Sequence, residues 1–302
     1  MLDSISNNKT AVALGNFDGF HIGHRAVVMN AVREKARGLL PVVLLFDVHP
    51  LGVIRGKAPP QLITPTELDN ELTSIGAKPV TVSFREIMNM SPGQFVDDIL
   101  VSHLNAGSVS CGFNFHFGKN SSGTPEILKK LCDERGIALT VAPAVIYDGK
   151  PVSSTRIRRA VADGDMRSAR EMLSHPFYYT FKVESGDRIG RTLGFPTINQ
   201  FFPDGFAVPR FGVYASRVML DGAYYPAVTD IGIRPTLVHK KQRSETNIIG
   251  FSGDLYGLDI KIELLDFIRP EIKFASLDEL KEQISRDSET GVRIYNELSG
   301  DL

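Results

Sequence analysis

Short apolar runs alternate with longer amphipathic stretches through the first half of the chain. The runs are mostly aliphatic or β-branched, which is typical of strands buried on both faces of a parallel sheet. They predict strands at Ala11–Gly15, Val42–Asp47, Val80–Phe84, Ser108–Gly112 and Leu139–Val145.

Capping signals predict helices between these strands. One helix is expected from His21 to Arg37, ending at Gly38, a residue suited to a left-handed cap. Two more begin at Ser91-Pro92 and Thr124-Pro125, where a hydroxyl N-cap precedes proline, and the second ends near Gly136. The alternation indicates a Rossmann-like α/β domain, with helices on both faces and ligands beyond the carboxyl ends of the strands.

The pattern changes near His175-Pro176. Runs rich in aromatic and β-branched residues, separated by Gly, Pro and Asp-Gly pairs, predict an antiparallel barrel that is closed or nearly closed. A terminal helix is indicated by a capping box, Ser276 with Glu279, and by an apolar stripe of Leu277, Leu280 and Ile284. The predicted barrel strands are Phe177–Val183, Gly212–Leu220, Ala223–Thr229, Thr246–Phe251 and Leu258–Phe267.

The length of 302 residues suits two domains, and the boundary is expected between Leu173 and Tyr178, giving domains 1–174 and 175–302. A net charge of −1 gives no overall attraction to nucleic acid or anionic membranes, while local phosphate sites remain possible. Self-association is left open. Two cysteines, a polar N-terminus and the lack of a membrane-length apolar run predict a cytoplasmic protein.

The segment Gly15–His24 (Gly-Asn-Phe-Asp-Gly-Phe-His-Ile-Gly-His) joins the first predicted strand to the first helix. Backbone N–H groups and the helix dipole favour phosphate there, and Gly19 and Gly23 allow close approach. His21 and His24 add donors for charge developing on a phosphoryl oxygen, which predicts nucleotidyl transfer. A chance turn is the simpler alternative. Zinc is disfavoured because the spacing is three and no third ligand lies nearby.

Two further segments contain candidate ligand-binding residues in the first half. Ser153-Ser154-Thr155 can cap a helix and donate to phosphate, while Arg156 and Arg158 can neutralise a triphosphate; a plain N-cap with solvated arginines is the alternative. Asn114, at a strand end, is a candidate nucleotide or flavin ligand. Its neighbours Phe113 and Phe115 are expected in the core.

In the second half, a glycine-rich segment from Gly186 leads into Pro196-Thr197-Ile198-Asn199. Glycines let a loop wrap phosphates, although a structural turn fits equally well. Thr197 and Asn199 alternate along an extended segment, so their oxygens form a reasonable partial shell for Mg²⁺. Glu245 is a candidate general base for an alcohol, with a solvent-facing carboxylate as the alternative.

Together these motifs resemble the bifunctional bacterial riboflavin kinase/FMN adenylyltransferase family over almost the whole chain. The resemblance rests on several segments in the family's order. They are Gly15–His24, Phe46–Pro50, Ser153–Arg158, Gly190–Asn199, Gly212–Ala215, Ile231–Thr236, Asp254–Gly257 and Arg269–Phe274.

The resemblance implies two linked reactions and their residues. In the barrel, ATP-Mg²⁺ phosphorylates riboflavin to FMN, with Thr197 and Asn199 holding Mg²⁺ and Glu245 as base. In the N-terminal domain, FMN attacks a second ATP to give FAD and pyrophosphate, and His21 and His24 stabilise the transition state. The implied ATP- and FMN-binding residues of the transferase are Gly15, Asn16, Phe17, Asp18, Gly23, Asn114, Ser153, Ser154, Thr155, Arg156 and Arg158; those binding ATP and flavin in the kinase are Gly186, Gly190, Arg191, Gly194, Pro196, Thr197, Asn199 and Arg269.

Four positions depart from the family pattern. The family often has Asp at Asn114, His and Asp at Asn247 and Gly250, and Gly at Phe181. One alternative is therefore an FMN adenylyltransferase whose barrel binds flavin with little or no kinase activity. A flavin-binding regulatory module is another. A class I aminoacyl-tRNA synthetase fragment fits poorly, because no Lys-Met-Ser-Lys-Ser-like loop is present.

Overall fold

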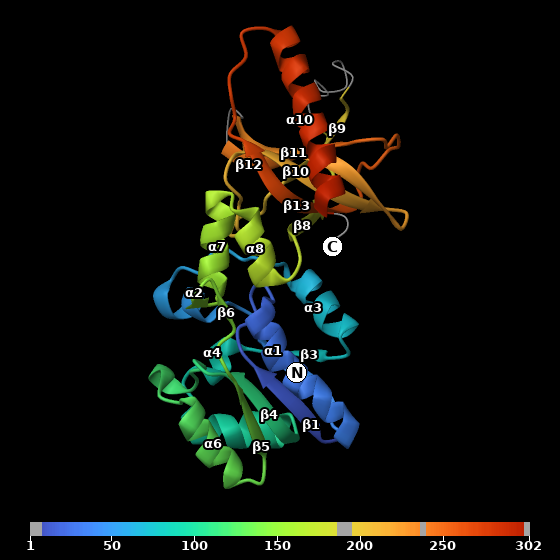
Figure 1. The fold of residues 1–302 in the computed structure, drawn as a ribbon. Helices are drawn as coiled ribbons and strands as arrows, with labels where there is room; N and C mark the ends of the chain where they lie inside the picture. The colour runs from blue at the N-terminus through green and yellow to red at the C-terminus, as the bar shows by residue number, and fades with distance from the viewer. Residues whose placement is uncertain (1–7, 186–194, 236–239, 299–302) are drawn as a thin grey trace. The chain divides into compact units, whose positions relative to one another are not determined.

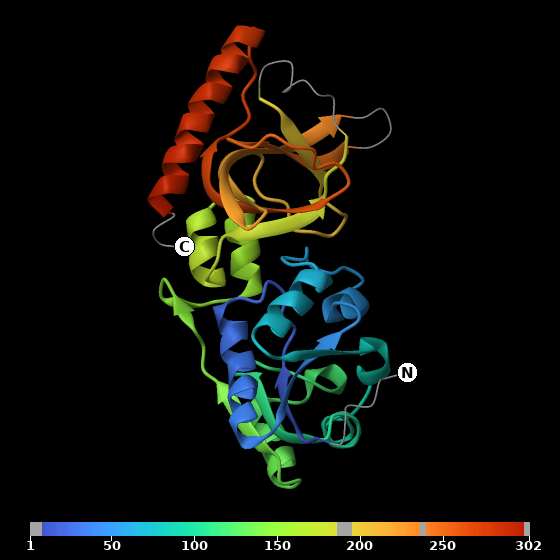
Figure 2. The same ribbon diagram turned by 90° about the vertical axis from the view of Figure 1, so that its right-hand side faces the viewer.

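The computed structural model describes residues 8–185, 195–235 and 240–298 (Figures 1 and 2). The chain forms two compact units, residues 1–154 and 155–302. The expected functional boundary between Leu173 and Tyr178 is a separate question and stays a prediction. Within the described ranges, no helix has both the length and the apolar character needed to span a bilayer.

A five-stranded parallel sheet forms the centre of the first unit, in the order β3-β2-β1-β4-β5. All five strands predicted from the apolar runs are confirmed, with ends shifted by a few residues. They are β1 (Thr10–Leu14), β2 (Leu40–Phe46), β3 (Lys78–Val82), β4 (Ala106–Gly112) and β5 (Ala138–Ala142).

The predicted helices of this unit are also confirmed. Helix α1 (Ile22–Arg33) runs into a 3₁₀ turn, η1 (Glu34–Arg37), and ends at Gly38, whose φ of 81° is left-handed. Ser91 caps α5 (Pro92–Gln94), which continues as a π-helix, η2 (Phe95–His103). Thr124 caps α6 (Pro125–Asp133), which ends before the expected Gly136. Elements that were not predicted are α2 (Pro50–Arg55), α3 (Pro65–Ser74), α4 (Phe84–Ile87), η3 (Lys119–Ser121), β6 (Ile146–Tyr147) and β7 (Lys150–Pro151).

Helices cover both faces of this sheet, as the Rossmann-like prediction requires. On one face α1 lies against β4, and the Ser110 hydroxyl donates to the Val27 carbonyl at 2.9 Å. On the other, η2 and α6 bury apolar side chains such as Leu100 and Leu128 against Val12 and Val109. Ligands of such sheets bind beyond the carboxyl ends of the strands, which places the loop after β1 at that edge.

The second unit contains a six-stranded antiparallel sheet in the order β8-β13-β10-β11-β12-β9. Beyond the end of β8, the Glu184 N–H donates to the Asn199 carbonyl of β9 at 2.8 Å, so the two outer strands meet. The predicted barrel is confirmed (Figure 2). Its strands are β8 (Phe177–Lys182), β9 (Thr197–Phe201), β10 (Gly212–Leu220), β11 (Ala223–Pro235), β12 (Lys240–Ile248) and β13 (Asp259–Arg269), with α7 (Ser154–Asp163) and α8 (Met166–Leu173) before them.

Hydroxyl side chains connect strands inside this barrel. The Ser216 and Thr229 hydroxyls lie 2.8 Å apart, and the Thr229 and Thr246 hydroxyls lie 2.9 Å apart. Along β12, Ser244 and Thr246 are buried, whereas the alternate residues Glu245 and Asn247 are only partly buried. Because side chains alternate along a strand, this pattern places Glu245 on the outer face of the barrel.

The terminal helix α10 (Leu277–Leu298) corrects one prediction. Its cap forms, since the Ser276 hydroxyl accepts from the Glu279 N–H at 3.2 Å. The predicted apolar stripe is wrong at Leu277, which is 66% exposed. The helix instead buries Asp287, Gly291 and Ile294 in its later turns, where Asp287 forms an ion pair with Arg269 of β13.

Two glycines allow a matched test of the barrel backbone. At Gly212 (φ 141°) a Cβ would lie 2.3 Å from the Arg269 carbonyl oxygen, whereas at Gly222 (φ 81°) a Cβ would meet nothing within 4 Å among the described residues. We expect Gly212→Ala to lower the free energy of unfolding by about 3 kcal/mol or more, and Gly222→Ala by about 1 kcal/mol. Urea denaturation followed by circular dichroism measures both. Equal effects would show that the close contact at Gly212 is unimportant.

Candidate active sites

The loop between β1 and α1 has an unusual backbone. Phe17, Gly19 and Phe20 have φ values of 45°, 80° and 37°, and both phenylalanine rings are fully buried. Left-handed conformations of bulky residues persist only where the surroundings hold them, and they are common at functional sites. At Gly19 a Cβ would lie 2.9 Å from a Leu62 methyl group, and the φ of 80° also favours glycine there. The loop is therefore held in one shape.

His21 and His24 stack at the start of α1. Their ring centroids are 3.6 Å apart with 16° between the planes. His21 is the N-cap, and its Nδ1 accepts from the His24 N–H at 3.2 Å. A neutral His21 therefore carries its proton on Nε2, where it can donate to a ligand. Phe17 supports the stack edge-on, with its ring centroid 5.4 Å from that of His24.

Burial keeps both imidazoles neutral. Desolvation lowers the pKa of His21 to about 4, and desolvation together with the neighbouring His21 holds the pKa of His24 well below its usual range. Nδ1 of His24 is buried with no hydrogen-bond partner among the described residues. An anion at the helix N-terminus would favour the charged form of either ring, so bound phosphate would raise both pKa values.

Asn16 and Asp18 attach this loop to its neighbours. The Asp18 carboxylate accepts a hydrogen bond from the Leu62 N–H at 2.9 Å. The backbone carbonyl of Asp18 accepts one from the Ser154 hydroxyl at 2.8 Å. The Asn16 amide lies 2.8 Å from Nε2 of His49, which caps α2 through its Nδ1. Five of the predicted residues, Asn16, Phe17, Asp18, His21 and His24, thus lie within one connected loop.

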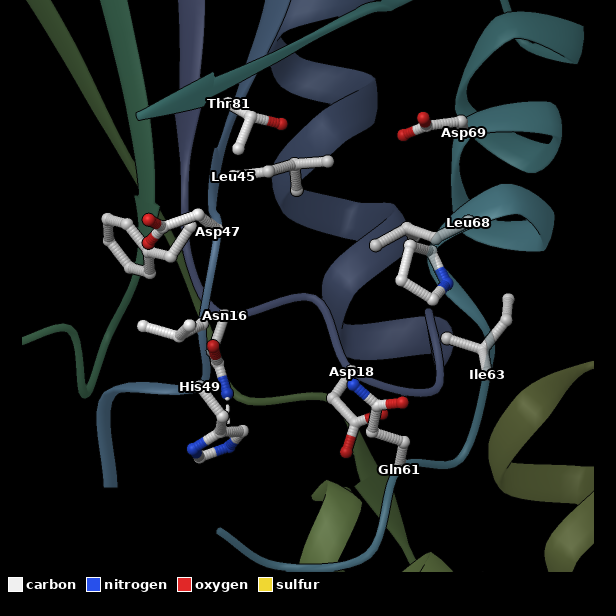
Figure 3. A pocket seen from close by; sticks show the side chains of 13 residues that line it. Asn16, Asp18, Leu45, Asp47, His49, Gln61, Ile63, Leu68, Asp69 and Thr81 are labelled. Carbon is white, nitrogen blue, oxygen red and sulfur yellow. Dashed lines mark hydrogen bonds between the residues drawn. The ribbon is translucent and has the colours of Figure 1, made fainter. Parts of the chain in front are cut away.

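A pocket of about 240 Å³ opens beside this loop, between β2, β3 and α3 (Figure 3). Sequence reasoning missed most of its lining. The segment Phe46–Pro50 was named for the family resemblance, but none of its residues was assigned to the site, although it follows a predicted strand. The lining residues are Asn16, Asp18, Leu45, Phe46, Asp47, Val48, His49, Gln61, Ile63, Pro65, Leu68, Asp69 and Thr81.

The other predicted residues of the first site come from other elements, and among them Ser154 contacts the loop through Asp18. Asn114 is exposed in the turn after β4. The prediction that Phe113 belongs to the core is wrong, since it is 48% exposed where the chain turns away from the sheet, while Phe115 packs against the core as expected. Ser153 and Ser154 lie at the start of α7, and Thr155, Arg156 and Arg158 follow within α7 in the second unit.

In the part of the chain that the structure describes, no group of three His, Cys, Asp or Glu residues is placed to hold a metal ion.

The second candidate site spans β9 and β12 on the outer face of the barrel. Glu245 is the direct cross-strand partner of Asn199, and Asn247 that of Thr197, so these side chains share one face. Asn199 is only 6% exposed, and its Oδ1 has no hydrogen-bond partner among the described residues. Glu245 forms an ion pair with Arg243. Predicted residues Gly186, Gly190, Arg191 and Gly194 lie outside the described residues.

Charged residues that the sequence analysis missed surround Glu245. Asp230 on β11 is its cross-strand partner on the other side. Desolvation, followed by the nearby Glu271 and Glu245 carboxylates, raises the pKa of Asp230 to about 6. Predicted Arg269 is held by Asp287, with its Nε 3.1 Å from both carboxylate oxygens. No sequence motif marks Asp230 or Arg243, because only strand register brings them to this face.

Comparison with known proteins identifies both halves. Residues 3–156 match the FAD synthetase family, and residues 173–295 match riboflavin kinase. A Bacillus subtilis protein named bifunctional riboflavin kinase/FMN adenylyltransferase is 36% identical, covering 96% of this chain and 94% of its own. This chain belongs to the bifunctional riboflavin kinase/FMN adenylyltransferase family. An Escherichia coli K12 member is 38% identical, covering 94% and 92%.

A solved structure shares the fold of this family member. The crystal structure of a Streptococcus pneumoniae protein described as a macrolide-efflux protein has a TM-score of 0.87 and 29% identity, covering 96% of this chain and 95% of its own. The presence of both domains supports the bifunctional interpretation over the adenylyltransferase-only alternative.

The departures from the family pattern have structural roles in the barrel. The Asn247 amide donates to the Pro196 carbonyl at 2.8 Å, which ties β12 to the start of β9. Phe181 packs among Tyr179, Phe202 and Phe206, with ring centroids 5.1–5.6 Å away. Gly250 has a φ of 79° and a Cβ there would meet no described atom within 4 Å. None of these substitutions displaces Glu245 or Asn199 from their shared face.

The buried imidazoles predict a pH-dependent stability. Above pH 6.5 neither folded nor unfolded chain protonates these rings, so their contribution is complete. As the pH falls toward 4, His21 and His24 become protonated in the unfolded chain but stay largely neutral in the folded chain. The free energy of unfolding therefore decreases. Between pH 7 and pH 4, His21 alone should lower the free energy of unfolding by about 3 kcal/mol.

Denaturant midpoints between pH 4 and 7 measure this effect. His24→Gln should reduce the pH dependence and leave the part due to His21, whereas His116→Gln, at an exposed histidine, should leave the whole dependence in place. A midpoint that is independent of pH in the unmodified protein would contradict the burial of neutral rings.

Proposed function

We propose that this protein converts riboflavin to FMN in its barrel and FMN to FAD in its N-terminal unit, using one ATP in each step. The observation that carries this proposal is the co-occurrence of the two domains in one chain. We place the functional boundary at 174/175, close to where the riboflavin kinase match begins. A cytoplasmic location is proposed with it, since Cys111 and Cys132 are free thiols and both reactions consume ATP.

For adenylyl transfer, the loop at the start of α1 would bind the phosphates. The FMN phosphate oxygen attacks the α-phosphorus of ATP, and the bond to the bridging oxygen breaks to release pyrophosphate. Nε2 of His21 and the neighbouring imidazole of His24 would donate to oxygens that gain charge. The helix dipole adds a favourable field at the same end. Gly15, Gly23, Asn114, Ser153, Ser154, Thr155, Arg156 and Arg158 would contribute the remaining contacts to ATP and FMN.

For the kinase step, Glu245 would accept the proton of the ribityl 5′-hydroxyl as its oxygen attacks the γ-phosphorus and ADP leaves. The Glu245 carboxylate is fixed by its ion pair with Arg243, so it can face the outer side of the sheet in one orientation. Positioning and charge neutralisation supply most of the rate in such transfers. Pro196, Arg269 and the segment Gly186–Gly194 are proposed to bind ATP and flavin.

The residues on β9 fit the Mg²⁺ ion that such a kinase uses. Asn199 presents a buried carbonyl oxygen without a hydrogen-bond partner among the described residues, and Thr197 lies two residues away on the same face. Neutral oxygens of this kind suit Mg²⁺, with phosphate oxygens and water completing the shell. When bound, Mg²⁺ would neutralise charge on the transferred phosphate.

The first prediction separates the two sites at His24. Purified protein given riboflavin, ATP and Mg²⁺ should form FMN and then FAD, as resolved by chromatography over time. His24→Ala should reduce FAD formation by a factor of about 10³ and leave FMN formation nearly intact, because it removes a transition-state donor. His103→Ala, at the far end of η2, is the control. No flavin product from the unmodified protein would refute the proposed function.

The second prediction concerns the kinase base. Glu245→Gln should slow FMN formation about 10²–10⁴-fold, because a neutral amide cannot accept the proton. The same variant supplied with FMN should form FAD at the normal rate. Glu282→Gln, an exposed residue of α10, is the matched control. If both activities fall together in this variant, the assignment of two separate sites is wrong.

A further inference from the structure

Two polar side chains meet where the chain leaves β1 and β2. These strands are parallel neighbours, with Leu14 paired to Leu44, so their carboxyl ends lie at the same edge of the sheet. Asn16 follows β1 and His49 follows β2, and both line the pocket beside the loop. Nδ2 of the Asn16 amide lies 2.8 Å from Nε2 of the His49 ring (Figure 3). This contact joins the two loops.

The other ring nitrogen of His49 fixes the position of the imidazole proton. Nδ1 accepts the backbone N–H of Leu51 at 3.1 Å, which makes His49 the N-cap of α2. A backbone N–H can only donate, so Nδ1 must keep its lone pair and carry no hydrogen. This requirement excludes both the Nδ1–H tautomer and the imidazolium form of the ring. The proton is therefore on Nε2, which faces Asn16 as a donor.

This tautomer decides the orientation of the Asn16 amide. An Nε2–H group cannot bond to the NH2 group of Asn16, because both are donors. A half-turn about χ2 exchanges the nitrogen and the oxygen of a carboxamide and leaves its other heavy atoms in place. With Oδ1 facing Nε2, the 2.8 Å contact becomes a hydrogen bond of normal length. No other hydrogen bond to a described residue holds the Asn16 side chain, so the His49 ring sets its orientation.

The NH2 group of Asn16 then lies on the side of the amide away from His49. It offers two N–H donors on an exposed residue, in the loop that leads into the N-terminus of α1. Donors at such a place suit an anionic oxygen. The carboxylates of Asp18 and Asp47 are bonded to backbone donors instead. Asp18 accepts from the Leu62 N–H, and Asp47 accepts from the Phe84 N–H, both at 2.9 Å.

Resting on the proposed function, we infer that His49 is a positioning residue for adenylyl transfer. Its Nε2–H holds the oxygen of Asn16 and thereby turns the Asn16 NH2 group toward a phosphate oxygen of ATP or FMN. His49 acts through Asn16 and does not touch the substrates. It also caps α2, but the cap uses Nδ1 and the contact with Asn16 uses Nε2. Substitutions that replace one ring nitrogen at a time therefore separate the two roles.

The test compares two substitutions of His49. In His49→Gln the side-chain amide can place an N–H donor where Nε2 lies, whereas the acceptor at Nδ1 is lost. In His49→Asn the shorter side chain is a good N-cap for the Leu51 N–H but does not reach Asn16. We expect His49→Asn to lower kcat/KM for FAD formation about tenfold, and His49→Gln to retain most of the activity.

Substitutions of Asn16 show whether His49 acts through it. Asn16→Ala should lower kcat/KM about 10–100-fold, because it removes a donor to a charged oxygen, and adding His49→Asn should cause no further loss. Asn16→Asp keeps an acceptor for Nε2–H but places a negative charge near the phosphate, so it should lose at least as much activity. KM values for ATP and for FMN are measured separately, and the larger increase identifies the phosphate that Asn16 binds.

Nitrogen-15 NMR of the ligand-free protein reports the tautomer itself. The signals of His49 are identified among those of the seven histidines by their absence in His49→Gln. Nε2 should appear as a protonated nitrogen and Nδ1 as an unprotonated one. Asn70→Ala, at an exposed amide of α3 outside the pocket lining, is the control and should form FAD normally. Phosphorylation of riboflavin by every variant reports folding and should not change.

The outcomes separate the inference from the proposed function. If Nδ1 carries the proton, or if His49→Asn is fully active while His49→Gln is impaired, His49 serves only as the cap of α2 and the inference is wrong. If the losses from Asn16→Ala and His49→Asn multiply in the double variant, His49 does not act through Asn16. In these cases the proposed function stands. If the unmodified protein forms no FAD from FMN, the proposed function fails and this inference fails with it.

Discussion

The burial of β1 is the constraint on which the first unit depends. Every residue from Thr10 to Leu14 is at most 1% exposed, and the strand is paired along its length with β2 on one edge and β4 on the other. β1 is paired on both edges and covered on both faces, so its register is fixed. The chain therefore leaves the sheet at a fixed position after Leu14. This position fixes where the loop Gly15–His21 begins, and with it the location of the stacked imidazoles of His21 and His24.

Local signals explain why much of this unit could be predicted. The aliphatic run of β1, the N-cap region of α1 and the left-handed Gly38 are each encoded within a few neighbouring residues. Helix α3 has an equally clear signal in its capping box, Thr64 with Glu67, which the sequence analysis overlooked. The polar lining residues Asp69 and Thr81 could not be foreseen as parts of one pocket, because they lie on α3 and β3, which only tertiary packing brings together.

In the barrel, sequence patterns do not predict which side chains become neighbours, because strand register decides that. Thr197, Asn199 and Glu245 could be named by resemblance, but only the pairing of β9 with β12 brings them to one face. Asp230 and Arg243 had no signal at all, since each acquires its neighbours through register. The terminal helix was misjudged at Leu277, because an apolar periodicity does not reveal which turns of a helix reach the barrel. Its later turns are held by Asp287 and by Gly291, where a Cβ would lie 2.7 Å from Val228.

The hydroxyl contacts inside the barrel have a consequence for folding. Ser216, Thr229 and Thr246 hydrogen-bond to one another only in the native alignment of β10, β11 and β12. A slip of β12 by one residue would turn Thr246 outward and bring the carboxylate of Glu245 into the interior, where an unpaired charge is very costly. Barrels with this misalignment therefore have a higher free energy than the native barrel, so few molecules with a misplaced Glu245 are present at equilibrium.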